Sequence, residues 1–170
     1  MNKVDLALAY AARGWKVLAL QPNSKIPLKS ALQEHGSKDA TDNPNTIRIL
    51  WGEYPNANVG IATGEASGLT VLDLDDRTTA RANVEALPGF KHPPQTYGVK
   101  TPRGWHLYYL FDSSISQSAG RVEKVDIRNN GGYVVAAGSE VDGVTYEALN
   151  DLPVAAWDFP PIFKNGYQAN

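Results

Sequence analysis

Residues 68–76 read Gly-Leu-Thr-Val-Leu-Asp-Leu-Asp-Asp, and this stretch decides how the chain folds. Its apolar, partly β-branched part, residues 69–72, is typical of a buried β-strand. Side chains alternate along a strand, so Asp73 and Asp75 point to the same face. Two carboxylates roughly 4–6 Å apart repel each other by about 3–4 kcal/mol at an effective dielectric near 20. The stretch therefore predicts either a cation bound between the two carboxylates or a strand that ends in solvated acids.

The composition is ordinary for a globular domain, with 42% hydrophobic and 20% charged residues. The chain has no cysteine, which excludes disulfides, cysteine nucleophiles and cysteine-ligated zinc and is compatible with the cytoplasm. No apolar run reaches membrane-spanning length, and no signal-peptide pattern opens the sequence. We therefore expect a cytoplasmic protein without a membrane partner.

The length of 170 residues suffices for one domain with a real core, in one lobe or two. We expect residues 1–170 to form a single domain, because no repeat, linker or low-complexity segment interrupts them. The formal net charge of −2 gives no overall basic field that would attract nucleic acid. Contact with DNA must then come from a local patch, a bound cation or another domain.

Helix and strand signals divide the chain into a mixed first half and a β-rich second half. Asn2 is expected to cap a first helix, and Asp42 or Asn43 a second one with Pro44 in its first turn. Residues 101–104 (TPRG) read as a turn and residues 129–132 (NNGG) as a hairpin turn. Further expected helices and strands follow: a helix at 78–87, and strands at 15–20, 58–63, 95–100, 105–111, 122–127, 133–137 and 144–148.

Three of the predicted strand ends carry acids or a histidine beside a turn: Asp73 with Asp75, then His106, then Asp126. Strand ends hold side chains rigidly, while the adjacent turns leave room for a ligand. Each signal also has a simpler interpretation, since His106 can be a packed sheet histidine and Asp126 can stabilise the turn that follows. Their joint occurrence nevertheless indicates one site, near which three cations can supply positive charge: Lys25, Arg103 and Arg128.

The chemistry of this residue set points to phosphoryl transfer. Three converging carboxylates fit hard cations with oxygen ligands, Mg²⁺ or Mn²⁺, better than zinc. Two such ions shared by aspartates activate an attacking oxygen and stabilise a leaving one, and nearby histidine and arginine can hold a triphosphate. The combination predicts nucleotidyl transfer.

Four blocks in order resemble the bifunctional DNA primase/polymerase N-terminal domain of the archaeo-eukaryotic primase superfamily. They span residues 9–28, 39–76, 101–109 and 125–139, nearly the whole chain. The family's acid-x-acid motif maps onto Asp73 and Asp75, its small-x-His motif onto Gly104 and His106, and its third acid onto Asp126. The small residue is often serine in the superfamily, so a hydroxyl that can touch the triphosphate is missing at Gly104.

The resemblance implies an α+β primase catalytic core, in which an α/β N-terminal lobe packs on an RRM-like lobe with the active site in the cleft between. It implies that Asp73, Asp75 and Asp126 bind two Mg²⁺ or Mn²⁺ ions and that His106 contacts the phosphates of the incoming nucleotide. Arg103, Lys25 and Arg128 would assist there.

The partners that the resemblance implies are a single-stranded or primed DNA template and dNTP or NTP substrates. Members extend primers with dNTPs, and many also start chains de novo. They often carry a helical accessory domain or a helicase, so we expect this domain to be the N-terminal part of a larger plasmid or phage replication protein.

Two alternatives compete with this interpretation. The run VLDLDD mimics the nucleophile motif of haloacid-dehalogenase-type phosphatases, but Arg77 stands where that motif has Thr or Val, and no later Gly-Asp-x-x-x-Asp block follows. The other alternative is a catalytically degenerate DNA-binding module that kept the fold. The presence of all three acids argues against it.

Overall fold

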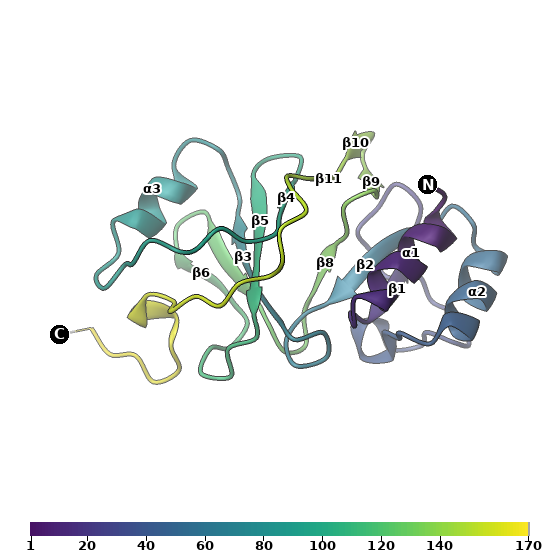
Figure 1. Ribbon diagram of the computed structural model, residues 1–170, viewed down its shortest axis with the longest axis horizontal. Helices are drawn as coiled ribbons and strands as arrows, with labels where there is room; N and C mark the ends of the chain where they lie inside the picture. The colour runs from purple at the N-terminus through teal and green to yellow at the C-terminus, as the bar shows by residue number, and fades with distance from the viewer. Residues whose placement is uncertain (170) are drawn as a thin grey trace.

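Two antiparallel β-sheets of unequal size form the frame of the computed structural model, which describes residues 1–169 (Figure 1). The smaller sheet has the order β1 (Val17–Leu20), β2 (Asn58–Ala62), β8 (Tyr133–Val135). Beside it lie α1 (Lys3–Ala12) and α2 (Pro44–Glu53), at the right of Figure 1. The larger sheet has the order β11 (Glu147–Ala148), β4 (Gly98–Lys100), β5 (Trp105–Leu110), β3 (Leu69–Leu74), β7 (Val125–Arg128), β6 (Ser118–Val122).

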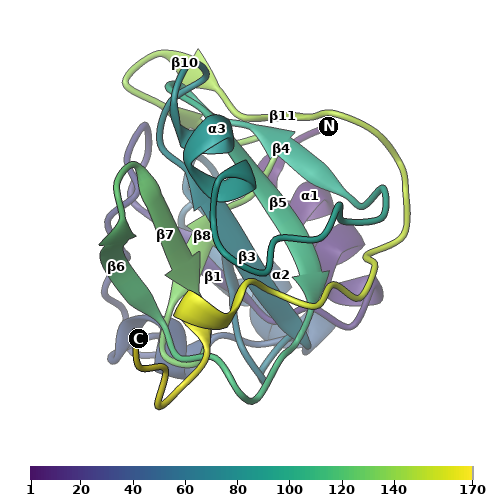
Figure 2. The ribbon, with the colours of Figure 1, turned by 90° about the vertical axis from the view of Figure 1, so that its left-hand side faces the viewer.

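The remaining elements are short. Helix α3 (Ala80–Glu85) covers one face of the larger sheet, as Figure 2 shows. A two-stranded ribbon joins β9 (Glu140–Val141) to β10 (Val144–Thr145), and two single 3₁₀ turns are η1 (Gly36–Asp39) and η2 (Pro161–Phe163). The chain is thus α+β, as the sequence predicts. No helix within residues 1–169 is both long and apolar enough to cross a bilayer.

The N-terminal helices begin where the sequence places their caps. The Asn2 side chain accepts a hydrogen bond from the Asp5 amide at 2.9 Å. The Asn43 side chain, one of the two predicted caps, accepts from the amides of Asn45 and Thr46. Side-chain oxygens at this position satisfy amides that have no partner within the helix. The predicted starts of both helices are therefore confirmed.

Strand β3 lies in the middle of the larger sheet, and its side chains alternate between two hydrophobic cores. Leu69 and Val71 belong to a core that combines residues of both sheets with α1 and α2. Leu72 and Leu74 belong to a second core with α3 and the C-terminal tail. Burial on both faces explains why the strand reads as a nearly continuous apolar run. Asp73 continues the alternation of Leu69 and Val71, so it faces the side where the smaller sheet lies.

The predicted single strand 122–127 is only partly correct: Val125–Arg128 form β7, but residues 122–124 end β6 and turn the chain into a hairpin. Strands β6 and β7 pair with each other, and Val122 lies opposite Val125. Lys124 adopts a φ of 67° in the turn between them. Most of β6 is exposed at the sheet edge, so it lacks the apolar alternation by which a strand is recognised.

The predicted hairpin at residues 129–132 is also wrong, since β7 and β8 do not pair with each other. Strand β8 instead pairs with β2 in the smaller sheet, so the turn carries the chain from one sheet to the other. Asn129 fixes this crossing: it is fully buried, and its amide donates to the carbonyls of Asp112 and Ile115. Its own carbonyl accepts from the Thr63 hydroxyl at 2.7 Å. Such long-range bonds leave no local signal in the sequence.

Other elements are shorter than predicted. The helix expected at 78–87 is α3, and the strand expected at 95–100 is β4. The strand expected at 144–148 is divided into β10 and β11 at Tyr146, which turns into the first core. Asp76, the last acid of the 68–76 stretch, does not join its neighbours. Its carboxylate accepts from the amides of Thr78, Thr79 and Ala80 and so begins α3.

Candidate active site

Asp73 holds the central position of the candidate site because β3 lies between β5 and β7. In register it faces His106 on β5 and Asp126 on β7. Directly opposed residues of antiparallel strands point their side chains to the same face. The His106 Nε2 atom lies 3.4 Å from Asp73 Oδ1. The structure thus brings together three side chains that come from separate parts of the sequence.

Asp75 extends the same face by one further step beyond the end of β3. Its amide donates to the Lys124 carbonyl at 2.8 Å, which holds the backbone extended next to the β6–β7 turn. Its carboxylate forms an ion pair with the Arg103 guanidinium at 2.7 Å. The Arg103 side chain is 73% exposed and stands on the turn between β4 and β5. Asp75 therefore lies at the mouth of the site.

Arg128 lies deeper, on the same strand and the same face as Asp126. Its NH2 nitrogen is 3.3 Å from Asp73 Oδ2 and 3.7 Å from Asp126 Oδ2. The side chain of Arg128 is 34% exposed, against 16% for Asp73 and 27% for Asp126. One guanidinium nitrogen of Arg128 therefore lies within ion-pair distance of two carboxylates.

A cavity of about 730 Å³ contains these side chains and has walls from both sheets. One wall is the larger sheet with the aspartates and His106; the other includes Lys25 from the loop after β1 and Tyr133 from β8. The Tyr133 hydroxyl donates to the Lys25 carbonyl at 2.8 Å and so fixes the loop at the cavity rim. All seven residues predicted for the site line this one cavity: Lys25, Asp73, Asp75, Arg103, His106, Asp126 and Arg128.

The turn at residues 101–104 tolerates only glycine at its last position. A Cβ atom added to Gly104 would lie 1.8 Å from the Leu74 carbonyl oxygen. The serine found at this position in other superfamily members therefore does not fit, and the missing hydroxyl follows from the close approach of β3. The Gly104 amide donates instead to the Thr101 hydroxyl at 3.0 Å.

Arg77 is a residue whose part in the site the sequence interpretation missed. Its guanidinium donates to the carbonyls of Thr101 and Pro102, and its carbon lies 6.0 Å from the centre of the Trp105 ring. These contacts fix the turn that carries Arg103 into the cavity. The sequence interpretation uses Arg77 only as a departure from the phosphatase motif. Its position directly after the acids of residues 73–76 is the sequence feature that indicates a place near the site.

The electrostatics of the site keep Asp73 ionised. Burial alone would raise the pKa of Asp73, but the hydrogen bond and charge of His106, followed by the charge of Arg128, hold it below the ordinary value of 3.8. Within residues 1–169 the Nδ1 atom of His106 is buried and has no hydrogen-bond partner. The His106 ring is thus oriented by Asp73 through one nitrogen only.

The donor chemistry of the three aspartates fits a hard divalent cation, because carboxylate oxygens are the ligands that Mg²⁺ and Mn²⁺ prefer. In the part of the chain that the structure describes, however, no three His, Asp or Glu side chains are gathered closely enough to hold a metal ion. Asp73 and Asp126 share Arg128, and Asp75 faces Arg103. Metal binding therefore stays a prediction for this site.

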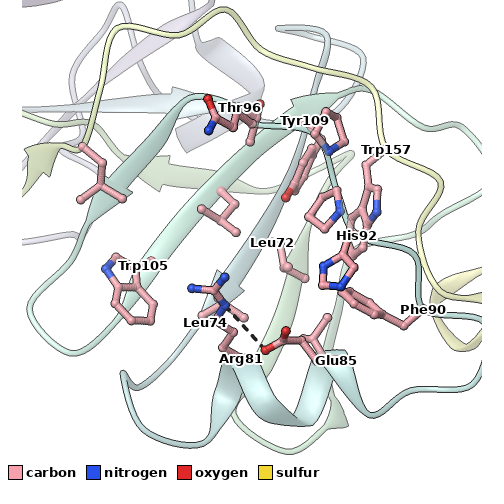
Figure 3. A pocket seen from close by; sticks show the side chains of 16 residues that line it. Leu72, Leu74, Arg81, Glu85, Phe90, His92, Thr96, Trp105, Tyr109 and Trp157 are labelled. Atoms are coloured by element: carbon pink, nitrogen blue, oxygen red, sulfur yellow. Dashed lines mark ion pairs between the residues drawn. The ribbon is translucent and has the colours of Figure 1, made fainter.

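A second cavity, of about 450 Å³, lies on the opposite face of the larger sheet (Figure 3). Its floor is formed by alternate residues of β3 and β5, such as Leu72, Leu74 and Tyr109, and α3 borders it. Arg81 and Glu85 form an exposed ion pair at 3.7 Å on that border. Among residues 1–169, Glu85 is the one acid that lines this cavity, and the three predicted aspartates all line the first cavity.

Taken together, these features define an α+β domain with a cavity between two sheets, in which the three predicted aspartates and the arginines come from the larger sheet and its turns. A family profile described as bifunctional DNA primase/polymerase, N-terminal, matches residues 7–160. The chain therefore belongs to this family, and the resemblance seen in the four sequence blocks is confirmed. At the level of the family, the activity is DNA primase and polymerase nucleotidyl transfer. A search of curated proteins found no match.

Proposed function

We propose that this domain carries out template-dependent nucleotidyl transfer, extending primers with dNTPs by a two-metal mechanism. The observation that supports it best is the register of β3: Asp73 faces His106 on one side and Asp126 on the other. This arrangement gathers acids from two strands on one wall of a cavity, within a chain of the primase/polymerase family. The same geometry would not arise from acids that merely end a strand in solvent.

Each side chain has a proposed role. Asp73, Asp75 and Asp126 would hold two Mg²⁺ or Mn²⁺ ions, which supply activation of the attacking hydroxyl and neutralise charge on the leaving pyrophosphate when bound. Arg103, Arg128 and Lys25 bind the triphosphate, since guanidinium groups match phosphate oxygens in pairs. His106, whose ring is oriented by Asp73, would contact a phosphate of the incoming nucleotide.

We further infer that the two sheets correspond to the two lobes of a primase core. The cavity walls support this, because Lys25 and Tyr133 belong to the smaller sheet and its loops, whereas the acids belong to the larger. Primer extension needs only a duplex end in the cavity. De novo priming must in addition hold two nucleotides on a template, so we expect extension to be easier to detect. The DNA template and the dNTPs are the proposed partners.

Primer extension by the purified domain tests the proposal. A labelled primer on a single-stranded template is incubated with dNTPs and either Mn²⁺ or Mg²⁺. Asp73→Asn and Asp126→Asn, which preserve side-chain size, should reduce incorporation at least ~100-fold, the scale on which loss of transition-state charge stabilisation acts. Asp151→Asn, an exposed acid outside the cavity, is the matched control and should extend normally. Equal extension by Asp73→Asn would overturn the assignment.

A further inference from the structure

We propose that Arg128 is an internal counter-ion that occupies the cation position between Asp73 and Asp126 and competes with metal for it. The inference rests on the proposed function, because it concerns the same carboxylates. It adds a step: a divalent ion binds only as the guanidinium leaves, and the triphosphate receives the guanidinium. Arg128 would then couple the binding of metal to the binding of nucleotide.

The geometry of one atom carries the inference. The NH2 nitrogen of Arg128 lies within 3.3 Å of Asp73 Oδ2 and 3.7 Å of Asp126 Oδ2. These two carboxylates project from directly opposed residues of β3 and β7, so the sheet fixes their backbones side by side and points both to the same face. A cation that bound both carboxylates would have to lie between them, where the guanidinium nitrogen now lies. Metal and Arg128 therefore exclude each other.

The charges in the cavity nearly balance in this arrangement. Asp73, Asp75 and Asp126 contribute three negative charges, and the ion-paired Arg103 and Arg128 return two positive charges to the same cavity. Lys25 and Asp142, which also line the cavity, cancel each other, and the remaining charge of −1 attracts a divalent ion weakly. Moving Arg128 away from its carboxylates raises the local attraction for a cation, but it leaves a guanidinium without a counter-charge.

A bound triphosphate would supply the counter-charge that the displaced Arg128 guanidinium needs, because it presents several anionic oxygens to the cavity. Arg128 is one-third exposed and lines the cavity, so its side chain can turn from the carboxylates toward a bound ligand without unfolding the strand. Metal then takes the carboxylates while nucleotide takes the arginine. By linkage, each ligand must strengthen the binding of the other by the same factor.

Arg103 provides a contrast within the same cavity. It contacts a single carboxylate, Asp75, at 2.7 Å, and its side chain is 73% exposed. It does not stand between two ligands of a shared ion. Neutralising Arg103 removes one positive charge from the cavity, just as neutralising Arg128 does, but it vacates no bridging position. Arg103→Gln is therefore the matched control for Arg128→Gln.

Direct measurement of Mn²⁺ binding tests the inference without reference to catalysis. Free Mn²⁺ is followed by electron paramagnetic resonance during titration of the full 170-residue chain, with and without a non-hydrolysable dNTP analogue. Without nucleotide, Arg128→Gln should bind Mn²⁺ about tenfold more tightly than the wild type, within the range of typical coupling between sites. Arg103→Gln should gain clearly less. Addition of the analogue should tighten Mn²⁺ binding in the wild type and much less in Arg128→Gln.

Two further variants separate the possible failures. Arg128→Lys retains the charge and should return Mn²⁺ affinity toward the wild-type value, while far-ultraviolet circular dichroism verifies that each variant is folded. If Asp73→Asn binds Mn²⁺ as the wild type does, the metal assignment of the proposed function fails. If Asp73→Asn loses binding but Arg128→Gln and Arg103→Gln gain equally or not at all, the function stands and the counter-ion inference is overturned.

Discussion

Asp73 and Asp126 face each other across the β3–β7 pair, and a single nitrogen of Arg128 lies within ion-pair distance of both. The repulsion that the sequence predicts between neighbouring acids is therefore offset by arginines. Asp73 also gains from His106 at 3.4 Å. Removing this carboxylate should cost stability rather than relieve repulsion, the opposite of what the sequence alone suggests.

The first prediction concerns this stability and its dependence on pH. The pKa of Asp73 lies below its ordinary value of 3.8, so its stabilising contribution is complete above about pH 5 and is lost as the pH falls through the folded-state pKa. Asp73→Asn should lower the free energy of unfolding by about 1–2 kcal/mol at pH 7, typical of a partly exposed, hydrogen-bonded charge. Urea unfolding of the wild type and of Asp73→Asn at pH 7 and pH 3 measures the difference in the free energy of unfolding at each pH.

The difference between wild type and Asp73→Asn should shrink at pH 3, since the wild-type carboxylate then begins to take up a proton. A difference that grows as the pH falls would show that Asp73 is not stabilised as an anion. Asp151→Asn, on the exposed tail, serves as the control and should show little change at either pH.

The second prediction concerns Gly104. A Cβ there would lie 1.8 Å from the Leu74 carbonyl oxygen, so Gly104→Ala must displace either the turn or the end of β3. We expect a loss of at least ~2 kcal/mol in the free energy of unfolding, on the scale of overpacked interiors, together with loss of primer extension. Thermal and urea unfolding measure the first effect.

Gly52 offers the matched control for that substitution. It lies in α2, and apart from its chain neighbours and the backbone of the same helix no heavy atom of the described chain lies within 4 Å of the Cβ that alanine would add. Gly52→Ala should stabilise the domain by roughly 0.5–1 kcal/mol, because alanine loses less backbone entropy in a helix. If the two alanine variants were equally stable, the close approach of Gly104 to β3 would be refuted.

The sequence predicts those features of the site that depend on neighbouring residues, but not those that depend on contacts between residues far apart in the chain. Because side chains alternate along a strand, Asp73 and Asp75 point to the same face of the sheet, while His106 and its neighbour Trp105 point to opposite faces. These two placements follow from the local sequence alone. The partners that tie these strands together are not local. Asn129 fixes the crossing between the sheets through Asp112 and Ile115, and nothing near residue 129 indicates those bonds.

The same distinction explains the arginines. A sequence shows that Arg103 and Arg128 lie near the acids, but it does not show which carboxylate each one contacts. Arg128 bridges two strands only because β3 and β7 are in register, which depends on the β6–β7 hairpin that the sequence interpretation did not resolve. The set of residues that line the cavity was thus predictable from residue types, whereas the ion pairs among them required the pairing of the strands.

The third prediction concerns Arg77, which positions the turn that carries Arg103. Arg77→Ala removes hydrogen bonds to the carbonyls of Thr101 and Pro102 and should lower the free energy of unfolding by about 1–2 kcal/mol. The looser turn should raise the KM for dNTP more than it lowers kcat. Arg81→Ala is the control, because its ion pair with Glu85 is exposed and worth about 0.5 kcal/mol or less. Equal effects of the two substitutions would contradict a positioning role.

The last prediction concerns the binding of DNA. The formal net charge is −2, and the arginines of the cavity are paired with acids, so we expect only about two to four phosphate contacts. With a slope near −0.7 per contact on single strands, the logarithm of the binding constant should fall with the logarithm of salt concentration with a slope of about −1.5 to −3. Binding should be micromolar or weaker.

Fluorescence anisotropy of a labelled oligonucleotide across a salt series measures this slope. The same titration with Mn²⁺ and a dNTP analogue should give tighter binding, because the metal ions offset the charge of the triphosphate and the base of the nucleotide can pair with the template. Lys25→Gln, at the rim of the cavity, should reduce the slope by at most about 0.7, the value of one contact. A nanomolar complex with a slope near −6 would instead reveal about nine phosphate contacts, which a chain of this charge could supply only from a basic surface outside the cavity.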